Sequence, residues 1–168
     1  MFMENPARAG FSISSIPSAK LSVWKNVKYK MESNELTSKI IGAAITVHKE
    51  LGPDLLESVY NSCLSIELKN CGLEVKTEVS LPVTYKGQKV SEEGFHLDMV
   101  VEDRVIVELK SVEKIQPVHQ KQLLTYLRLA NKPLGLLINF NGVSIRDGIC
   151  RVVNSDKGVI DKAIDKPL

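Results

Sequence analysis

The sequence predicts an α/β fold in which helices flank a central mixed sheet. Two patterns support this fold class: segments with the three- to four-residue spacing of a helix face, and short apolar or alternating segments typical of strands. Their predicted order is helix, three strands, helix, strand. The 168 residues, of which 43% are hydrophobic and 25% charged, suit one globular domain of ordinary composition.

The expected domain begins with a predicted helix. Apolar residues recur at steps of three and four over residues 34–51, and a Gly-Pro pair then ends the pattern. A second helix is expected to run to about Asn70 with Asp54 as its N-cap. Pro117 suits the first position of another helix, which continues to about Ala130.

The predicted strands lie between these helices and after the last of them. Residues 73–81 alternate and are rich in Val and Thr, and a tight polar turn separates the next two apolar segments. A nearly continuous apolar run before Asn141 predicts a buried strand. The expected strands are 73–81, 95–101, 105–109 and 134–140, with 148–153 as one more.

The two ends of the chain differ from this centre. Residues 1–32 mix Ser, Pro, Gly and Lys without a sustained period, and we expect a flexible arm there, followed by a domain over 33–154 and a polar tail over 155–168. No apolar run approaches the ~20 residues of a membrane span. Three cysteines without CxxC spacing favour neither a disulfide framework nor structural zinc, so we expect a reduced, cytoplasmic setting.

The formal net charge of +2 gives no global attraction to nucleic acid, so binding would need a local basic patch. Basic residues in the second half of the core either line one edge and follow a phosphate backbone or serve only solubility. Little aromatic surface lies between them, which argues against a dedicated single-strand platform. These residues are Lys86, Lys89, Lys110, Lys114, Lys121, Arg128 and Lys132.

Three charged residues interrupt the predicted buried strands. Glu108 and Lys110 end the apolar run that starts at Val105, and the two-residue period of a strand places both side chains on one face. Asp98 interrupts the preceding strand. Because a short turn pairs these strands antiparallel, we expect Asp98 near Glu108 or Lys110. Charges inside an apolar sheet are costly unless they pair or bind a metal.

Two interpretations of these residues remain open. Two carboxylates suit Mg²⁺ or Mn²⁺, with water and substrate phosphate completing the coordination. Lys110 would then orient the attacking water or stabilise the departing charge. The other interpretation is a structural ion pair of Lys110 with Asp98 or Glu108 at the end of the sheet.

The segment from Asp54 to Tyr60 carries a further acid. Glu57, in the first turn of its expected helix, would reach over the sheet as another acidic ligand or hold a water, with Tyr60 one turn later on the same side. Alternatively, Asp54 and Glu57 form a variant of the capping box, and Tyr60 is a partly buried core residue.

A polar stripe marks the helix that begins at Pro117. His119, Gln122 and Tyr126 fall at steps that share one helix face. Gln122 would position a nucleophile or hold a phosphate, while His119 would bind phosphate or act as a general acid. His119 and Tyr126, together with Tyr60, are the expected substrate-binding residues. The alternative is a polar side that only bonds to neighbouring loops.

Taken together, these features resemble the PD-(D/E)xK nuclease superfamily. The resemblance rests on the element order, on Asp98, on the Glu108-Leu109-Lys110 triplet and on Gln122 in the following helix.

Residues 48–60 resemble more closely the signature of the GxxExxY proteins, a group within that superfamily. The likeness continues through residues 122–127 and 136–141. Asp54 stands where the signature has its first glycine, whereas Glu57 and Tyr60 keep the expected spacing.

The resemblance implies a restriction-endonuclease-like core and a metal-dependent nuclease that acts on DNA or RNA. It implies that Asp98 and Glu108, joined by the carbonyl of Leu109, bind Mg²⁺ or Mn²⁺, that Lys110 is the catalytic lysine and that Glu57 is an additional acid. The other function considered is a non-catalytic module on the same scaffold, which binds nucleic acid or a protein partner. No membrane partner is expected.

Overall fold

The computed structural model describes residues 18–155 and 160–162. The chain divides into two units, Met1–Ser38 and Lys39–Leu168. Helix α1 (Ser18–Leu51) contributes to both units. The later elements are α2 (Glu57–Asn70), β1 (Val75–Tyr85), β2 (Gln88–Val101), β3 (Val105–Lys110), α3 (Pro117–Leu129), β4 (Leu134–Asn139), the short 3₁₀ helix η3 (Ile145–Gly148), β5 (Ile149–Val153) and β6 (Ile160–Lys162).

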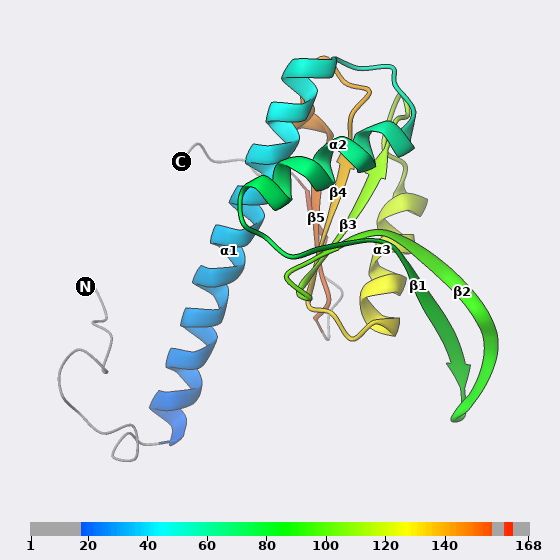
Figure 1. Ribbon diagram of the computed structural model, residues 1–168. Helices are drawn as coiled ribbons and strands as arrows, with labels where there is room; N and C mark the ends of the chain where they lie inside the picture. The colour runs from blue at the N-terminus through cyan, green and yellow to red at the C-terminus, as the bar shows by residue number, and fades with distance from the viewer. Residues whose placement is uncertain (1–17, 156–159, 163–168) are drawn as a thin grey trace. The chain divides into compact units, whose positions relative to one another are not determined.

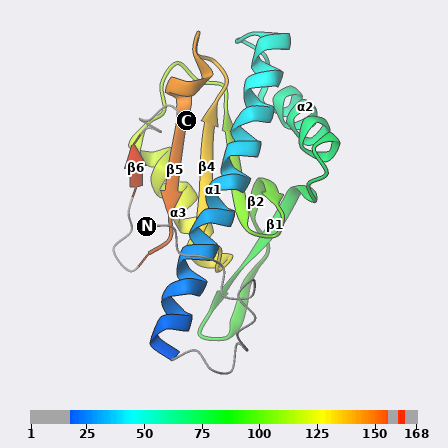
Figure 2. The same cartoon turned by 90° about the vertical axis from the view of Figure 1, so that its left-hand side faces the viewer.

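The described strands form one mixed sheet in the order β1-β2-β3-β4-β5-β6. Neighbouring strands are antiparallel except β3 and β4, which are parallel. A parallel pair needs a crossover connection, and α3 supplies it. Figure 2 shows β6 beside β5 at one edge and the β1–β2 hairpin at the other. The predicted α/β class, a mixed sheet flanked by helices, is confirmed.

Helices α2 and α3 lie on opposite sides of the central strands (Figures 1 and 2). On the α3 side of the sheet, Leu123 and Leu127 belong to an apolar cluster with Ile106 of β3 and Leu137 of β4. At Gly135 of β4 a Cβ atom would lie 2.8 Å from the side chain of Leu123. Glycine there lets α3 pack directly against the sheet.

Several boundaries differ from the sequence prediction. Strand β1 continues to Tyr85 and β2 begins at Gln88, beyond the predicted 73–81 and 95–101, because the two strands pair up to the turn between them. Helix α1 begins at Ser18 rather than near Asn34. Helix α2 begins at Glu57, its N-cap is Leu56, and it has no side-chain cap, so the prediction of Asp54 as the N-cap is wrong. Strand β6 falls in the segment expected to be a tail. Of the predicted arm and tail, residues 1–17, 156–159 and 163–168 lie outside the described residues.

Candidate active site

The strands β2 and β3 stop pairing next to the two acids. Their ladder runs from Val101 opposite Val105 to Met99 opposite Val107, so the next pair in register is Asp98 and Glu108. At that point the side-chain carboxylates of Asp98 and Glu108 accept main-chain N–H groups in place of main-chain carbonyls of the neighbouring strand. The N–H of Asp98 donates to Glu108 Oε1 at 3.3 Å, and the N–H of Leu109 donates to Asp98 Oδ2 at 2.7 Å. The expected proximity of Asp98 and Glu108, here called the acid pair, is confirmed.

Lys110 lies on the same strand as Glu108, two residues further on. Its Nζ is 3.8 Å from Glu108 Oε2, at the outer limit of an ion pair. Glu108 is only 4% exposed, whereas Asp98 and Lys110 are half-buried. The buried acid therefore lies beneath two groups that solvent or a ligand can reach.

Burial and, to a smaller extent, the negative charge of Asp98 raise the pKa of Glu108 to about 8, against the smaller lowering effect of the Lys110 ammonium. Desolvation also raises the pKa of Asp98, against the N–H of Leu109 and the charge of Lys110, which lower it. The charge of Glu57 contributes to raising both values, so Glu57 belongs to the same electrostatic centre. If Asp98, Glu108 and Glu57 were all ionised, their negative charge would exceed what the Lys110 ammonium offsets, so the protein alone favours a protonated Glu108.

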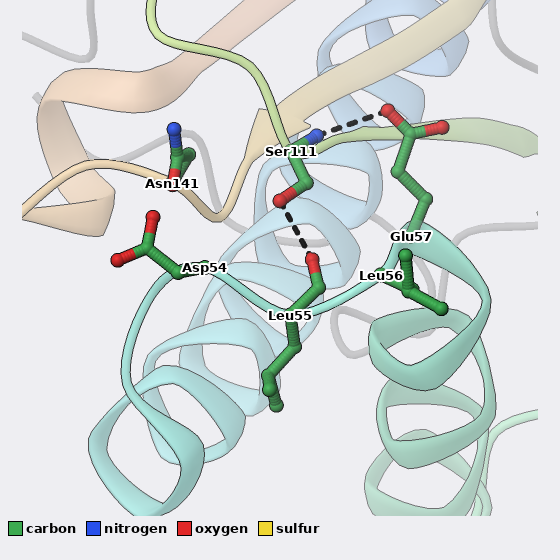
Figure 3. A pocket seen from close by; sticks show the side chains of 6 residues that line it. All are labelled: Asp54, Leu55, Leu56, Glu57, Ser111 and Asn141. Carbon is green, nitrogen blue, oxygen red and sulfur yellow. Dashed lines mark hydrogen bonds between the residues drawn. The ribbon is translucent and has the colours of Figure 1, made fainter.

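Glu57 connects the start of α2 to the loop after β3. Its Oε1 accepts the N–H of Ser111 at 3.0 Å, and the Ser111 hydroxyl donates to the Leu55 carbonyl at 2.7 Å (Figure 3). Because Ser111 follows Lys110 directly, these bonds hold the end of β3 against α2. The capping-box interpretation of Asp54 and Glu57 is wrong, since this carboxylate binds a residue 54 positions away.

An open hollow of about 540 Å³ lies at this junction. In Figure 3, Asp54 and Asn141 stand on one side and Leu56 and Glu57 on the other. The acid pair does not line the hollow but adjoins it through Lys110 and Ser111. The hollow is lined by Asp54, Leu55, Leu56, Glu57, Ser111 and Asn141.

Tyr60 supports the loop between α1 and α2. It is fully buried, and its ring stacks on Phe140 with centroids 4.3 Å apart. Its hydroxyl donates to the Gly52 carbonyl at 2.7 Å and accepts the N–H of Leu55 at 3.2 Å. The structure thus places Tyr60 beneath the hollow rather than on a surface that a substrate reaches, because both bonds of its hydroxyl are used within the loop.

The polar stripe of α3 divides into two parts. Gln122 Nε2 donates to the hydroxyl of Tyr126, which is buried. Burial is the main cause that raises the pKa of Tyr126, and the charges of Glu108 and Asp98 also raise it, so Tyr126 lies near the acid pair. His119 instead faces its own helix end, where its Nδ1 accepts the N–H of Gln116 at 3.1 Å. Gln122 and Tyr126 therefore lie together, whereas His119 completes a capping box.

A family model described as the PD-(D/E)XK nuclease superfamily matches residues 34–152, which include the acid pair and all of α2 and α3. The chain belongs to this superfamily. Its fold is the restriction-endonuclease-like fold of these nucleases, which generally use divalent metal ions. A comparison with curated proteins finds no match, and neither does a comparison with solved structures.

Two residues at the acid pair escape sequence analysis. The buried side chain of Asn61 on α2 donates to Glu78 Oε1 at 2.9 Å and to the main-chain carbonyl of Asp98 at 3.2 Å. Glu78, inside β1, has a φ of +50°, a conformation that costs a residue other than glycine free energy. Such a backbone conformation persists only where neighbouring groups fix it, and here the hydrogen bond from Asn61 helps to fix Glu78.

Asn61 contributes more to this site than to general packing. Its Oδ1 is buried without a hydrogen-bond partner among the described residues, which makes the residue expensive in a core. It lies one helical turn after Glu57, on the same face of α2. That spacing is a usable sequence signal, whereas no sequence pattern marks the left-handed backbone of Glu78.

Asp98 and Glu108 fit a divalent cation by the chemistry of their donors. Two carboxyl groups lie on adjacent strands, where Lys110 offsets their mutual repulsion only in part, and Mg²⁺ is commonly held by one or two carboxylates plus water. In the part of the chain whose side chains are described, no three His, Cys, Asp or Glu residues are arranged to hold a metal. Asp98 and Glu108 are therefore the two carboxyl groups that would hold such an ion.

None of the helices within the described residues is both long and apolar enough to span a membrane.

Proposed function

We propose that the chain is a metal-dependent phosphodiester hydrolase, a nuclease that cleaves DNA or RNA. One observation carries this proposal: in a member of the PD-(D/E)XK nuclease superfamily, Asp98 and Glu108 replace the main-chain ladder where β2 leaves β3, with Lys110 directly beside them. A structural ion pair alone would need one acid for one lysine. The second buried acid has no such partner, so its ionised form is costly unless it serves a cation.

Asp98, Glu108 and the carbonyl of Leu109 are the proposed ligands of Mg²⁺ or Mn²⁺. When bound, the ion would lower the pKa of a water molecule and neutralise charge on the phosphate in the transition state. Lys110 is half-buried with its ammonium toward the acid pair, which suits a group that orients the attacking water and offsets charge on the leaving oxygen.

Glu57 and Gln122 are proposed to assist from the two helices. Glu57 lines the hollow and lies within electrostatic reach of both acids, so its carboxylate would hold a water at the edge of the site. Gln122 is exposed and bonded to Tyr126, close to the other side of the acid pair. Its amide would contact a phosphate oxygen or the nucleophile.

The proposed direct substrate contact is His119, and Tyr126, which is buried, is proposed to act through Gln122, to which its hydroxyl is bonded. Because Nδ1 of His119 accepts a main-chain N–H, the ring proton is assigned to Nε2, which is then a donor for a phosphate oxygen. The hollow of about 540 Å³ has the size of a small-ligand site and would take a nucleotide next to the scissile phosphate. Tyr60 contributes indirectly, through the loop that it holds.

Within the superfamily, we propose that the chain belongs with the GxxExxY proteins. Asp54, which stands at the position of the first glycine in that signature, has a φ of +70°. This left-handed conformation is the one that glycine adopts freely and Asp tolerates better than most residues. The backbone thus accounts for a glycine at this position in the signature. The proposed domain is residues 33–154 together with β6, which pairs with β5 at the edge of the sheet.

Activity assays on the full chain test the proposed nuclease. We expect it to cleave DNA or RNA with Mg²⁺ or Mn²⁺ and to lose this activity in EDTA. Lys110→Ala is expected to reduce the cleavage rate by at least about 100-fold, because it removes a charge next to the reacting phosphate. Lys114→Ala changes an exposed lysine four residues away and serves as the control. Equal cleavage by Lys110→Ala and wild type would mean contamination or another site.

A further inference from the structure

Glu78 of β1 lies in the same row of the sheet as the acid pair. Thr77 of β1 pairs with Met99 of β2, so the next position in register joins Glu78 to Asp98. On the other side of β2, Asp98 is in register with Glu108. Three acids on three neighbouring strands thus occupy one row across the sheet, with Asp98 in the middle.

The amide of Asn61 fixes Glu78 beside Asp98. A single nitrogen, Nδ2 of Asn61, donates to Glu78 Oε1 at 2.9 Å and to the main-chain carbonyl of Asp98 at 3.2 Å. Asn61 is only 7% exposed and belongs to α2, so the packing of that helix sets its position. The Glu78 carboxylate is therefore held next to the main chain of Asp98.

The fold alone does not explain the pairing of Asn61 with Glu78. Glu78 is exposed, so it buries little surface, and its φ of +50° is a conformation that glycine adopts at lower cost. Asn61 is costly in a core, because its Oδ1 is buried without a partner among the described residues. Glycine at position 78 and an apolar residue at position 61 would fold at lower cost, which indicates that the held carboxylate has another task.

The charge of Glu78 reaches the acid pair. Burial is the main cause that raises the pKa of Asp98, and the charges of Glu57 and Glu78 raise it too. Within the described part of the chain, the second carboxylate oxygen of Glu78, Oε2, makes no hydrogen bond or ion pair. An exposed carboxylate with one oxygen fixed and the other open can attract a hydrated cation and accept a hydrogen bond from its water.

Glu78 is not placed as a third direct ligand of a metal ion. Among the described residues, no three His, Cys, Asp or Glu side chains are arranged to hold one ion. Mg²⁺ keeps several of its waters when one or two carboxylates bind it, and groups outside the coordination sphere still tune its affinity. A charge fixed beside Asp98 suits such an indirect role.

We propose that Glu78 is an outer acid of the proposed cation site, whose charge strengthens the binding of a hydrated divalent cation at the acid pair. Asn61 is the positioning residue that holds this charge in place. The inference rests on the proposed function, because it needs a cation between Asp98 and Glu108. It adds β1 and the middle of α2 to the elements that act on that cation.

Calorimetric titration with Mn²⁺ at pH 8, without nucleic acid, tests Glu78 separately from cleavage. Glu78→Gln keeps an acceptor for Asn61 and removes only the charge. We expect its Mn²⁺ affinity to fall by about tenfold at low ionic strength. In about 1 M salt, where the Debye length is about 3 Å, the same substitution should cost less than about threefold. A merely structural role of Glu78 would not produce this dependence on salt.

Two further variants separate the charge of Glu78 from its backbone. Glu78→Gly removes the left-handed strain together with the charge, so the Mn²⁺ affinity should fall as in Glu78→Gln while the thermal midpoint is kept or raised. Asn61→Leu removes the bond that holds the carboxylate, and its effect on the affinity should be mostly absent in the Glu78→Gln background. A full Asn61→Leu loss in that background would overturn the assignment of Asn61.

The matched control is Glu74→Gln, which neutralises an exposed acid four residues earlier whose carboxylate pairs with Lys76 instead. It should bind Mn²⁺ as wild type does. Equal affinity of Glu78→Gln and wild type at low salt, or a loss that is the same at high salt, would overturn the role of Glu78 and leave the acid pair as the cation site. A wild type that binds no Mn²⁺ would overturn the cation site itself. Glu78-dependent Mn²⁺ binding without cleavage of DNA or RNA would sustain the inference and contradict the nuclease instead.

Discussion

Glu108→Gln is expected to reduce metal-dependent cleavage by at least about 1000-fold. Gln is nearly isosteric with Glu and can still accept the N–H of Asp98, so the fold is retained. What is lost is one of the two charged ligands proposed for the metal, and the loss of metal-dependent stabilisation of the transition state amounts to several kcal/mol. Initial rates at saturating Mg²⁺ and Mn²⁺ measure the effect.

The matched control for this variant is Glu113→Gln, which neutralises an exposed acid five residues further along the chain. Its rate should lie within about twofold of wild type, as for an exposed change distant from the chemistry. Cleavage by Glu108→Gln at the wild-type rate would show that Glu108 has a structural role only.

Without metal, the free energy of unfolding should fall as the pH rises from 4.5 to about 8. The folded protein holds the proton of Glu108 up to a pKa of about 8, whereas an ordinary Glu releases it near 4.5. The protonated form is favoured by burial, so its stabilisation is complete below pH 4.5 and is lost as the pH passes through 8. The slope is at most about 1.4 kcal/mol per pH unit for one proton.

Comparison with Glu108→Gln isolates this contribution. The variant cannot titrate at that position, so we expect it to match wild type at pH 5 and to exceed it in stability at pH 9. Urea unfolding in EDTA at the two pH values supplies both differences. If the difference in unfolding free energy between wild type and Glu108→Gln were the same at pH 5 and at pH 9, a buried Glu108 that holds its proton would be contradicted.

The acid pair and Lys110 can be predicted from the sequence because the patterns that indicate them are local. Two apolar strands joined by a tight turn place Asp98 opposite Glu108, and the period of two puts Lys110 on the same face. Pro117 likewise marks the first residue of α3. Short-range periodicity and one antiparallel turn suffice to predict where these residues lie.

The surroundings of the acid pair depend on contacts between distant segments. Asp54 and Glu57 match a local capping rule, yet Glu57 binds Ser111, because the loop after β3 brings a free N–H to the helix end. Asn61 bonds two different strands, and Glu78 adopts a left-handed backbone inside a strand. Neither the pairing of remote segments nor a φ above zero in a charged residue leaves a pattern in one sequence.

Calorimetric titration with Mn²⁺ at pH 8, in the absence of nucleic acid, tests the central claim most directly. We predict one saturable site in wild type and in Glu113→Gln. Its affinity should fall by at least about 10- to 100-fold in Asp98→Asn and in Glu108→Gln, since each loses a charged ligand. No binding by wild type, or binding of equal strength by these two variants, would contradict a cation held between the two acids.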